Sequence, residues 1–244
     1  MIHLVNLSKQ FGNIKAVDRL NLVVSSGELF GFIGPNGAGK TTTIHMIGGL
    51  LAPTEGSVII DGIDMAKEPE KAKKKIGLIP DRPFLYEKLT GMEFLKFTAD
   101  LYEVGEEAFL ERSEKLLNMF SLVDRAHELI ESYSHGMKQR LIMSAALLHE
   151  PPLIVVDEPM VGLDPRGIKM VKNLFRSLVA KGTTIFMSTH TLGLAEDVCD
   201  RIGIINNGKL IVTGTINELK HTAQTGEADL EEVFFQLTEK EISL

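Results

Sequence analysis

The segment from Gly34 to Thr42 has the residue types and the spacing needed to bind phosphate. Glycines let the backbone curl so that several N–H groups point at phosphate oxygens, and the N-terminus of a following helix adds positive potential. Lys40 is expected to reach the β- and γ-phosphates, and the Thr41 hydroxyl to ligate Mg²⁺. We therefore predict a nucleoside-triphosphate site. Its pattern, G-x-x-x-x-G-K-[ST], is matched by Gly34, Pro35, Asn36, Gly37, Ala38, Gly39, Lys40, Thr41 and Thr42.

Two adjacent carboxylates follow an apolar run later in the chain. The run 153–156 leads directly into Asp157, Glu158 and Pro159. Asp157 could hold the hydration shell of Mg²⁺, and Glu158 could orient and deprotonate the water that attacks the γ-phosphate. A strand that ends in an acidic turn is an equally good explanation of these residues taken alone. Combined with the phosphate loop, they favour hydrolysis.

A third segment, Tyr133-Ser134-His135-Gly136-Met137-Lys138-Gln139, stands at the expected start of a helix. Ser134 can cap that helix, and Gly136 allows another molecule to approach closely. A helix N-terminus with little side-chain bulk suits an anion. Taken alone, the segment is more simply explained as a helix cap.

These segments need a scaffold, and the apolar patterning predicts one of the α/β class. Fully apolar runs indicate strands covered on both faces, while the runs 2–7 and 20–24 suggest antiparallel strands near an edge. Asn206-Asn207-Gly208 is a hairpin signal. We expect a P-loop NTPase core whose sheet is mostly parallel with added antiparallel strands. The runs expected to be buried strands are 29–33, 58–60, 76–79, 153–156, 184–187 and 202–205.

Residues 88–150 differ from the rest because they contain almost no Gly or Pro. Thr90-Gly91-Met92-Glu93 has the spacing of a capping box and should open a first helix. A second helix is expected around 106–120, and a third from Ser134 to the break at Pro151-Pro152. We predict an α-helical subdomain inserted into the α/β core.

The composition excludes several classes of protein. The chain has 244 residues, with 26 Lys and Arg against 33 Asp and Glu, and its net charge of −7 disfavours nucleic acid as a partner. The lone Cys199 rules out an internal disulfide and suits a reducing cytosol. No apolar run approaches the ~18–20 residues of a membrane span, and the start lacks the pattern of a signal peptide.

The order of the motifs resembles that of the ATP-binding subunit of an ABC transporter, over essentially the whole chain. After the phosphate loop come the segments 133–139 and 153–159. The resemblance continues into the segments 202–210 and 214–219, and the C-terminal residues 230–238 resemble the ABC-2 exporter-type subgroup, which includes drug and antibiotic efflux systems. The remaining motifs are Gly162-Leu163-Asp164-Pro165 and Ser188-Thr189-His190.

This resemblance implies a role for several residues. Phe11 matches the aromatic residue that stacks on adenine, and Asp164 matches the loop that crosses the interface of a dimer. His190 matches the switch histidine that contacts the γ-phosphate, beside Glu158 and Lys40 as catalytic residues. The signature motif, which contacts the γ-phosphate held by the other subunit, is matched by Ser134, His135, Gly136, Met137 and Lys138.

Two residues depart from the family pattern. His135 stands where a second small residue is usual, and we expect it to point outward. Asp81 stands where a strand normally ends in a Gln that touches Mg²⁺. Its carboxylate can still ligate Mg²⁺ but adds negative charge near the γ-phosphate, so we expect slower or differently coupled turnover. The expected metal ligands are Thr41, Asp157 and Asp81.

The resemblance implies one ATPase domain over 1–220, with its α/β core in 1–87 and 151–220 and its helical subdomain in 88–150. Residues 221–244 would be a C-terminal helical extension. ATP and Mg²⁺ are the expected cofactors, and the partners are a homodimer mate or paired ATPase subunit and an integral membrane permease, with no nucleic acid. The chain should be cytoplasmic and peripheral on the inner membrane face. The permease is expected to dock on 88–150 and the Asp81 segment.

Three alternatives remain open at this point. A non-transport ABC protein usually carries long coiled-coil inserts or two fused cassettes, and this chain has neither. A GTPase would carry Asn-Lys-x-Asp, which is missing, and a small-molecule kinase would leave the signature-like segment unexplained. A nucleotide-responsive binding module with weak hydrolysis is hinted at only by Asp81 and His135.

Overall fold

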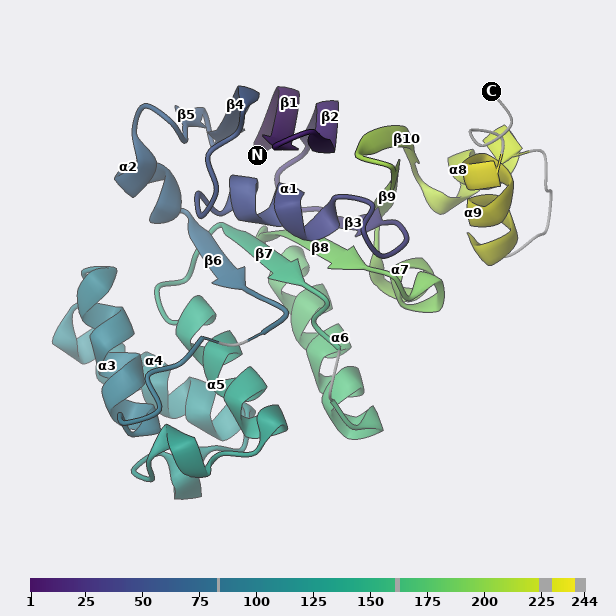
Figure 1. Ribbon diagram of the computed structural model, residues 1–244. Coiled ribbons are helices and arrows are strands. Elements are labelled where there is room, and N and C mark those ends of the chain that lie inside the picture. The colour runs from purple at the N-terminus through teal and green to yellow at the C-terminus, as the bar shows by residue number, and fades with distance from the viewer. Residues whose placement is uncertain (83, 161–162, 224–229, 240–244) are drawn as a thin grey trace.

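Six strands form the central sheet of the computed structural model, which describes residues 1–82, 84–160, 163–223 and 230–239. Gly162 and residues 224–229 and 240–244 of the expected C-terminal extension lie outside these ranges. The strand order is β10-β9-β3-β8-β7-β6; β10 runs antiparallel and the other five are parallel (Figure 1). These strands are β3 (Leu29–Ile33), β6 (Ile76–Ile79), β7 (Leu153–Asp157), β8 (Thr184–Thr189), β9 (Arg201–Asn206) and β10 (Lys209–Gly214).

A second, antiparallel sheet covers one side of the first, with α1 (Lys40–Ile47) packed between them (Figure 1). Its order is β2-β1-β4-β5, and it contains the run 58–60 that we expected among the strands covered on both faces. That expectation was wrong, because Val58 and Ile60 are buried while Ile59 is only half-buried. The strands are β1 (Ile2–Phe11), β2 (Ile14–Val24), β4 (Glu55–Ile60) and β5 (Ile63–Asp64).

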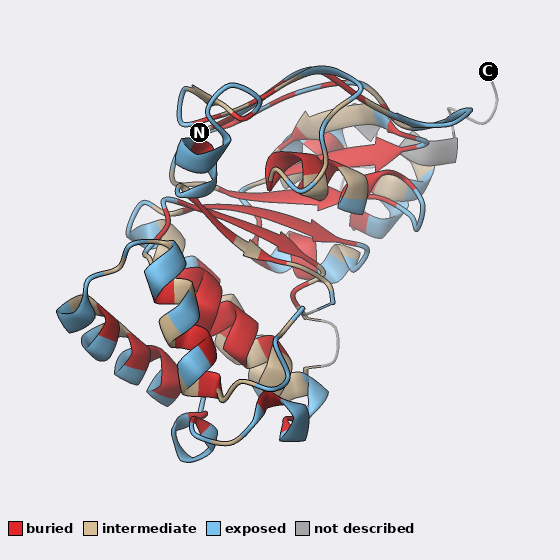
Figure 2. Ribbon diagram, turned by 60° about the vertical axis from the view of Figure 1, so that its left-hand side comes forward, coloured by how far each residue is buried: buried red, intermediate tan, exposed pale blue. Residues whose placement is uncertain are grey.

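The runs 29–33, 153–156, 184–187 and 202–205 of the central sheet are buried on both faces, as predicted (Figure 2). At the edges of the sheet, Leu78 of β6 is half-buried, which departs from the prediction for the run 76–79, and most of β10 is half-buried. Because side chains alternate along a strand, Phe30 and Phe32 of β3 face α1 and the antiparallel sheet, while Leu29 and Ile33 face the opposite core. Phe186 of β8 packs against both β3 phenylalanines, with ring centroids 5.7 and 5.3 Å apart. The β9–β10 hairpin turns at Asn207 and Gly208, both with positive φ, as the Asn-Gly pair predicted.

Helices follow β6 and lead back to β7, within the segment 88–150. The capping box at the start of α3 is confirmed: the Glu93 N–H donates to Thr90 Oγ1 at 3.2 Å, and the Thr90 N–H donates to Glu93 Oε2 at 2.7 Å. The first of the two prolines, Pro151, is buried at the start of the return into β7. The helices are α3 (Gly91–Leu101), α4 (Glu106–Met119), the 3-10 helices η1 (Val123–Arg125) and η2 (Ile130–Ser132), and α5 (His135–Leu147).

The remaining helices flank the sheets. Leu230 and Val233 of α9 are buried in the core on the far side of the central sheet from α1. None of the helices in the described part of the chain is both long and apolar enough to span a membrane. The helices are α2 (Pro69–Lys73), α6 (Pro165–Ala180), α7 (Leu192–Val198), α8 (Ile216–Ala223) and α9 (Leu230–Glu239).

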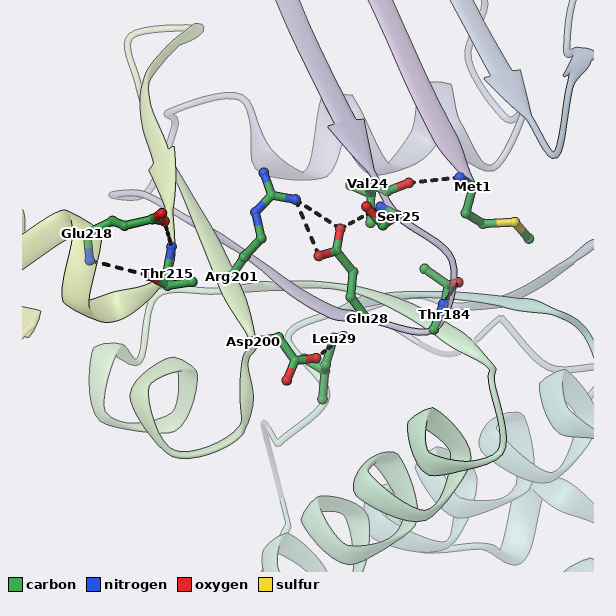
Figure 3. A network of polar contacts seen from close by, with 11 residues as sticks. Met1, Val24, Ser25, Glu28, Leu29, Thr184, Asp200, Arg201, Thr215 and Glu218 are labelled. Carbon is green, nitrogen blue, oxygen red and sulfur yellow. Dashed lines mark hydrogen bonds and ion pairs between the residues drawn. The ribbon is translucent and has the colours of Figure 1, made fainter.

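Polar contacts fix the beginning of β3 against its neighbours (Figure 3). Glu28 accepts from Arg201 at 3.1 and 3.3 Å, and the Leu29 N–H donates to Asp200 at 2.8 Å. The Gly27 N–H donates to the Thr184 hydroxyl at 2.9 Å. The starts of β3, β8 and β9 are thereby held in one register, so their carboxyl ends, where the functional loops begin, are also aligned.

Candidate functional site

The phosphate loop connects β3 to α1, as predicted, and its glycines are needed for close packing. Gly39 has φ +108°, and a Cβ there would lie 2.4 Å from the Ala16 carbonyl oxygen. A Cβ at Gly34 would lie 2.3 Å from the Ile205 carbonyl oxygen. No larger residue fits either position without moving backbone, so the loop is held in a curl that exposes Pro35, Asn36 and Gly37.

Lys40 is the first residue of α1 and is only 7% exposed. Its ammonium donates to the carbonyl oxygens of Gly34 at 2.7 Å and Pro35 at 3.1 Å, across the loop. Burial lowers the pKa of Lys40, and the negative charges of Glu158 and Asp157 partly oppose that shift. The positive charge at the start of α1 is therefore kept close to two carboxylates.

Asp157 is the last residue of β7 and Glu158 follows it, and each carboxylate accepts from a hydroxyl at the end of the adjacent strand β8. The Ser188 hydroxyl donates to Asp157 Oδ1, and Asp157 is 2% exposed. Glu158 has φ +50°, an uncommon backbone conformation for a residue with a side chain, and its N–H donates to the Ser188 carbonyl at 3.2 Å.

Glu158 turns its carboxylate toward His190. Oε1 of Glu158 lies 2.8 Å from Nδ1 of His190, and Oε2 accepts from the Thr189 hydroxyl at 3.3 Å. The Glu158 side chain is 14% exposed and that of His190 is 52% exposed. The carboxylate is thus directed by two groups from the β8 end and still reaches solvent.

One cavity of about 410 Å³ brings most of the predicted residues together. Asp81, Glu158 and His190 reach it from β6, β7 and β8, because parallel strands end at the same edge of a sheet. Ala16, which the sequence analysis did not single out, also lines it. The other lining residues belong to the phosphate loop and α1: Asn36, Gly37, Gly39, Lys40, Thr41 and Thr42.

The oxygen atoms around this cavity suit Mg²⁺. Thr41 and Asp81 line the cavity, and the buried Asp157 directly precedes Glu158, which also lines it. Thr41, Asp81 and Asp157 supply one hydroxyl and two carboxylates. The described residues hold no cluster of three or more His, Cys, Asp or Glu that would enclose a metal. Mg²⁺ is usually bound by one or two carboxylates together with substrate phosphates and water, so this sparse donor set fits it.

Other predicted residues lie away from the cavity. Phe11, at the end of β1, is 50% exposed and has the Lys9 ammonium 5.2 Å from its ring centre. Ser134 caps α5 by accepting from the Met137 N–H at 3.3 Å. Phe11, Ser134 and Met137 are not among the residues that line the cavity. Gly136 is in the same first turn.

Asp164 and His135 have different surroundings. Asp164 caps α6, accepting from the Gly167 N–H at 2.8 Å. His135 is exposed. Ser188 and Thr189 received no role of their own from the sequence analysis, although two consecutive hydroxyls before His190 were a usable signal.

The strand order, the phosphate loop between β3 and α1, and the carboxylates that end β7 define the fold of a P-loop nucleoside triphosphatase. In comparison with known proteins, the model of the ABC transporter family matches residues 17–161. The chain therefore belongs to the ABC transporter family, to its ATP-binding subunits, which are ATPases.

Individual relatives agree with this assignment. The chain is 38% identical over 219 residues to the linearmycin resistance ATP-binding protein LnrL of Bacillus subtilis strain 168, covering 90% of this chain and 70% of that protein. It is 39% identical over 221 residues to the bacitracin transport ATP-binding protein BcrA of Bacillus licheniformis, covering 90% and 71%.

Two solved structures are also similar. An ATP binding subunit of an ABC transporter superposes with a TM-score of 0.93 at 36% identity, covering 98% of this chain and 99% of that one. A dimeric post-hydrolysis state of the ATP-binding cassette MJ0796, bound to ADP and Pi, gives a TM-score of 0.81 at 29% identity, covering 88% and 98%.

Proposed function

We propose that this ATPase hydrolyses Mg-ATP in the cavity between the phosphate loop and the ends of β6, β7 and β8, and so powers export through separate membrane subunits. The observation that carries this proposal is the shared cavity, in which Lys40, Glu158 and His190 approach from three elements. It offers a cation for the phosphates, a base and a second polar group within one small volume.

Each of these residues has a distinct task in the proposed reaction. Lys40 stabilises the charge on the β- and γ-phosphates once ATP replaces its contacts to the Gly34 and Pro35 carbonyls. Glu158 accepts a proton from the attacking water and, held by two contacts, does so in a preset direction. His190 contacts the γ-phosphate beside Glu158.

Thr41, Asp157 and Asp81 are the residues that would hold Mg²⁺. The ion, when bound, neutralises part of the triphosphate charge and orients its oxygens. The Ser188 hydroxyl fixes one oxygen of Asp157. Phe11 would stack on adenine at the edge of the site, where its half-exposed ring is accessible.

A second copy of an ATPase subunit would complete the site. Ser134, Gly136 and Met137 lie in the first turn of α5, outside the cavity of their own chain. The N–H groups at the start of that helix and the helix dipole favour an anion, so a partner's α5 could cover the γ-phosphate. The dimeric state of MJ0796 supports this arrangement. Hydrolysis would remove the phosphate that joins the two halves.

The membrane partner is an integral permease, and the chain would sit on the inner face of the membrane through it. An aromatic patch formed by Phe84, Tyr86 and Phe97 supports a docking surface beside Asp81. These side chains are 78%, 50% and 39% exposed, and the Tyr86 ring centre lies 6.0 Å from that of Phe84 and 5.5 Å from that of Phe97. Since LnrL and BcrA are named for resistance to linearmycin and for bacitracin transport, the proposed cargo class is antibiotics.

The substitution Glu158→Gln tests the assignment of the base. The amide has nearly the same shape but accepts no proton, so turnover should fall at least a hundredfold while ATP affinity changes little. The variant should also accumulate as an ATP-bound dimer, measured by size-exclusion chromatography with light scattering. Glu107→Gln, on the exposed surface of α4, is the matched control. Hydrolysis by Glu158→Gln at the parental rate would contradict the assignment.

A further inference from the structure

The ends of β7 and β8 match each other residue for residue. In the parallel register Asp157 lies beside Ser188, and the next residue of each strand follows in the same order. Ser188 donates its hydroxyl proton to Asp157, and Thr189 donates its own to Glu158. Two consecutive hydroxyls therefore contact two consecutive carboxylates, and both hydroxyl residues are buried, at 0% and 1% exposure.

Thr189 makes two contacts that connect different parts of the site. Its Oγ1 donates to Oε2 of Glu158 at 3.3 Å and accepts from the Thr191 N–H at 3.0 Å. The Thr191 contact closes the turn that carries His190. His190 in turn lies 2.8 Å from the other oxygen of the same carboxylate. One hydroxyl thus joins the Glu158 side chain to the backbone of the turn that presents His190.

Glu158 depends on such contacts because its own backbone does not restrict it enough. It stands beyond the last residue of β7 with φ +50°, and a glutamate side chain has three rotatable bonds that the backbone does not fix. Two contacts on different oxygens select one orientation, in which Glu158 still lines the nucleotide cavity. Preorganisation of this kind lowers the barrier, because the base does not have to be ordered during the reaction.

From this geometry we infer that Thr189 is a positioning residue for hydrolysis, which holds the Glu158 carboxylate and the His190 turn in a fixed relation through its hydroxyl. The inference rests on the proposed function of Glu158 as the base. Thr189 itself lines a neighbouring cavity, on the other side of His190 and Glu158, and is not among the residues that line the nucleotide cavity. Its effect should therefore be on the rate of the chemical step and not on nucleotide affinity.

The substitution Thr189→Val tests this, because valine keeps the shape and the β-branch but has no hydroxyl. Loss of a hydrogen bond to a charged group should lower kcat about ten- to hundredfold. The dissociation constant for ATP should change less than about twofold, because Thr189 does not line the nucleotide cavity. It is measured by isothermal titration in the Glu158→Gln background, in which ATP is not hydrolysed. Thr189→Ser restores the hydroxyl and should recover most of the parental kcat.

Thr184→Val is the matched control at the opposite end of the same strand. Thr184 is also 1% exposed, and its hydroxyl accepts from the Gly27 N–H at a point remote from the carboxylates. Thr184→Val loses this one contact, whereas Thr189→Val loses two. Thr184→Val should destabilise the protein without lowering kcat. Equal kcat losses in Thr184→Val and Thr189→Val, or no rescue by serine, would overturn the positioning role.

A crystal structure of Thr189→Val gives a readout that does not need turnover. We expect Oε1 of Glu158 to leave hydrogen-bond distance of His190 Nδ1, or the side chain to occupy more than one rotamer. An unchanged Glu158–His190 contact would overturn the inference even if the parental chain proved inactive. Inactivity of the parental chain with Mg-ATP would instead contradict the proposed function.

Discussion

At the scale of single residues, the cavity is marked by a buried ammonium group with carboxylates close to it. Lys40 is buried with its ammonium on two carbonyl oxygens, and Glu158 and Asp157 offset the cost of burying it. Asp81 adds a third carboxylate to the same surroundings. A bound triphosphate adds negative charge, which repels the Asp81 carboxylate. A cation that binds both the carboxylate and the phosphates removes this repulsion.

Asp81→Asn should therefore alter the dependence of hydrolysis on Mg²⁺. The amide oxygen is a weaker ligand for a hard cation than a carboxylate, so half-maximal activity should need a several-fold higher Mg²⁺ concentration. Asp81→Gln should shift it in the same direction. The measurement is ATPase rate against free Mg²⁺, with Asp124→Asn on the exposed turn η1 as control. If the Mg²⁺ titrations of parent and variant coincide, Asp81 is not a ligand.

At the scale of elements, an aromatic contact joins the end of α3 to the residues that follow α5. Tyr102 caps the end of α3, and His149 follows α5 by two residues; their ring centroids lie 3.8 Å apart with the planes 17° from parallel. Burial lowers the pKa of His149 from its usual 6.5 to about 4. In the folded protein the His149 ring is therefore neutral at pH values above about 4.

This shift predicts a loss of stability in mild acid. Between about pH 6.5 and 4 the unfolded chain binds a proton at His149 that the folded chain does not, so the free energy of unfolding falls as the pH falls, by up to about 1.4 kcal/mol per pH unit. His149→Phe keeps a ring against Tyr102 without a titrating group. Its stability should fall less between pH 7 and pH 5 in urea denaturation. His127→Gln, at an exposed histidine, is the control. An identical pH slope in parent and His149→Phe would refute this.

At the scale of the whole molecule, the nucleotide site and the proposed permease surface share one connecting segment. Asp81 lines the cavity, and the aromatic patch begins three residues later. Glu87, in the same segment, pairs with Lys138 of α5 at 2.5 Å. The segment therefore connects the β6 end to the helix whose first turn is proposed to cover a partner's γ-phosphate, so a permease docked on the patch would lie beside both.

Phe84→Ser should weaken binding to the membrane subunits and leave the isolated ATPase intact. Phe84 is 78% exposed, so the change removes apolar contact area for a partner and little of the core. Co-purification with the permease should drop markedly, while the basal ATPase rate and the Tm stay near parental values. Val23→Ser, 54% exposed on β2, is the matched control. Full recovery of permease with Phe84→Ser would place the docking surface elsewhere.

Local signals in the sequence were enough for the phosphate loop, the capping box at Thr90, the Asn207-Gly208 turn and the buried run of β3. Each depends on residues a few positions apart, whose propensities and side-chain contacts act within one turn or one strand. Asp157 and Glu158 are adjacent in the sequence, so they could be picked out as a pair for the same reason. The short range of these signals also explains the wrong placement of the run 58–60, since an apolar triplet does not reveal which sheet it joins.

The relations between distant segments became clear only once the strands were assembled. Asp81, Glu158 and His190 come from three strands and meet because β6, β7 and β8 are parallel neighbours. Thr189 acquires a role only because the register of β8 sets it beside the carboxylates of β7. Strand order and register depend on the packing of the whole core, to which every segment contributes and which no short window of sequence contains.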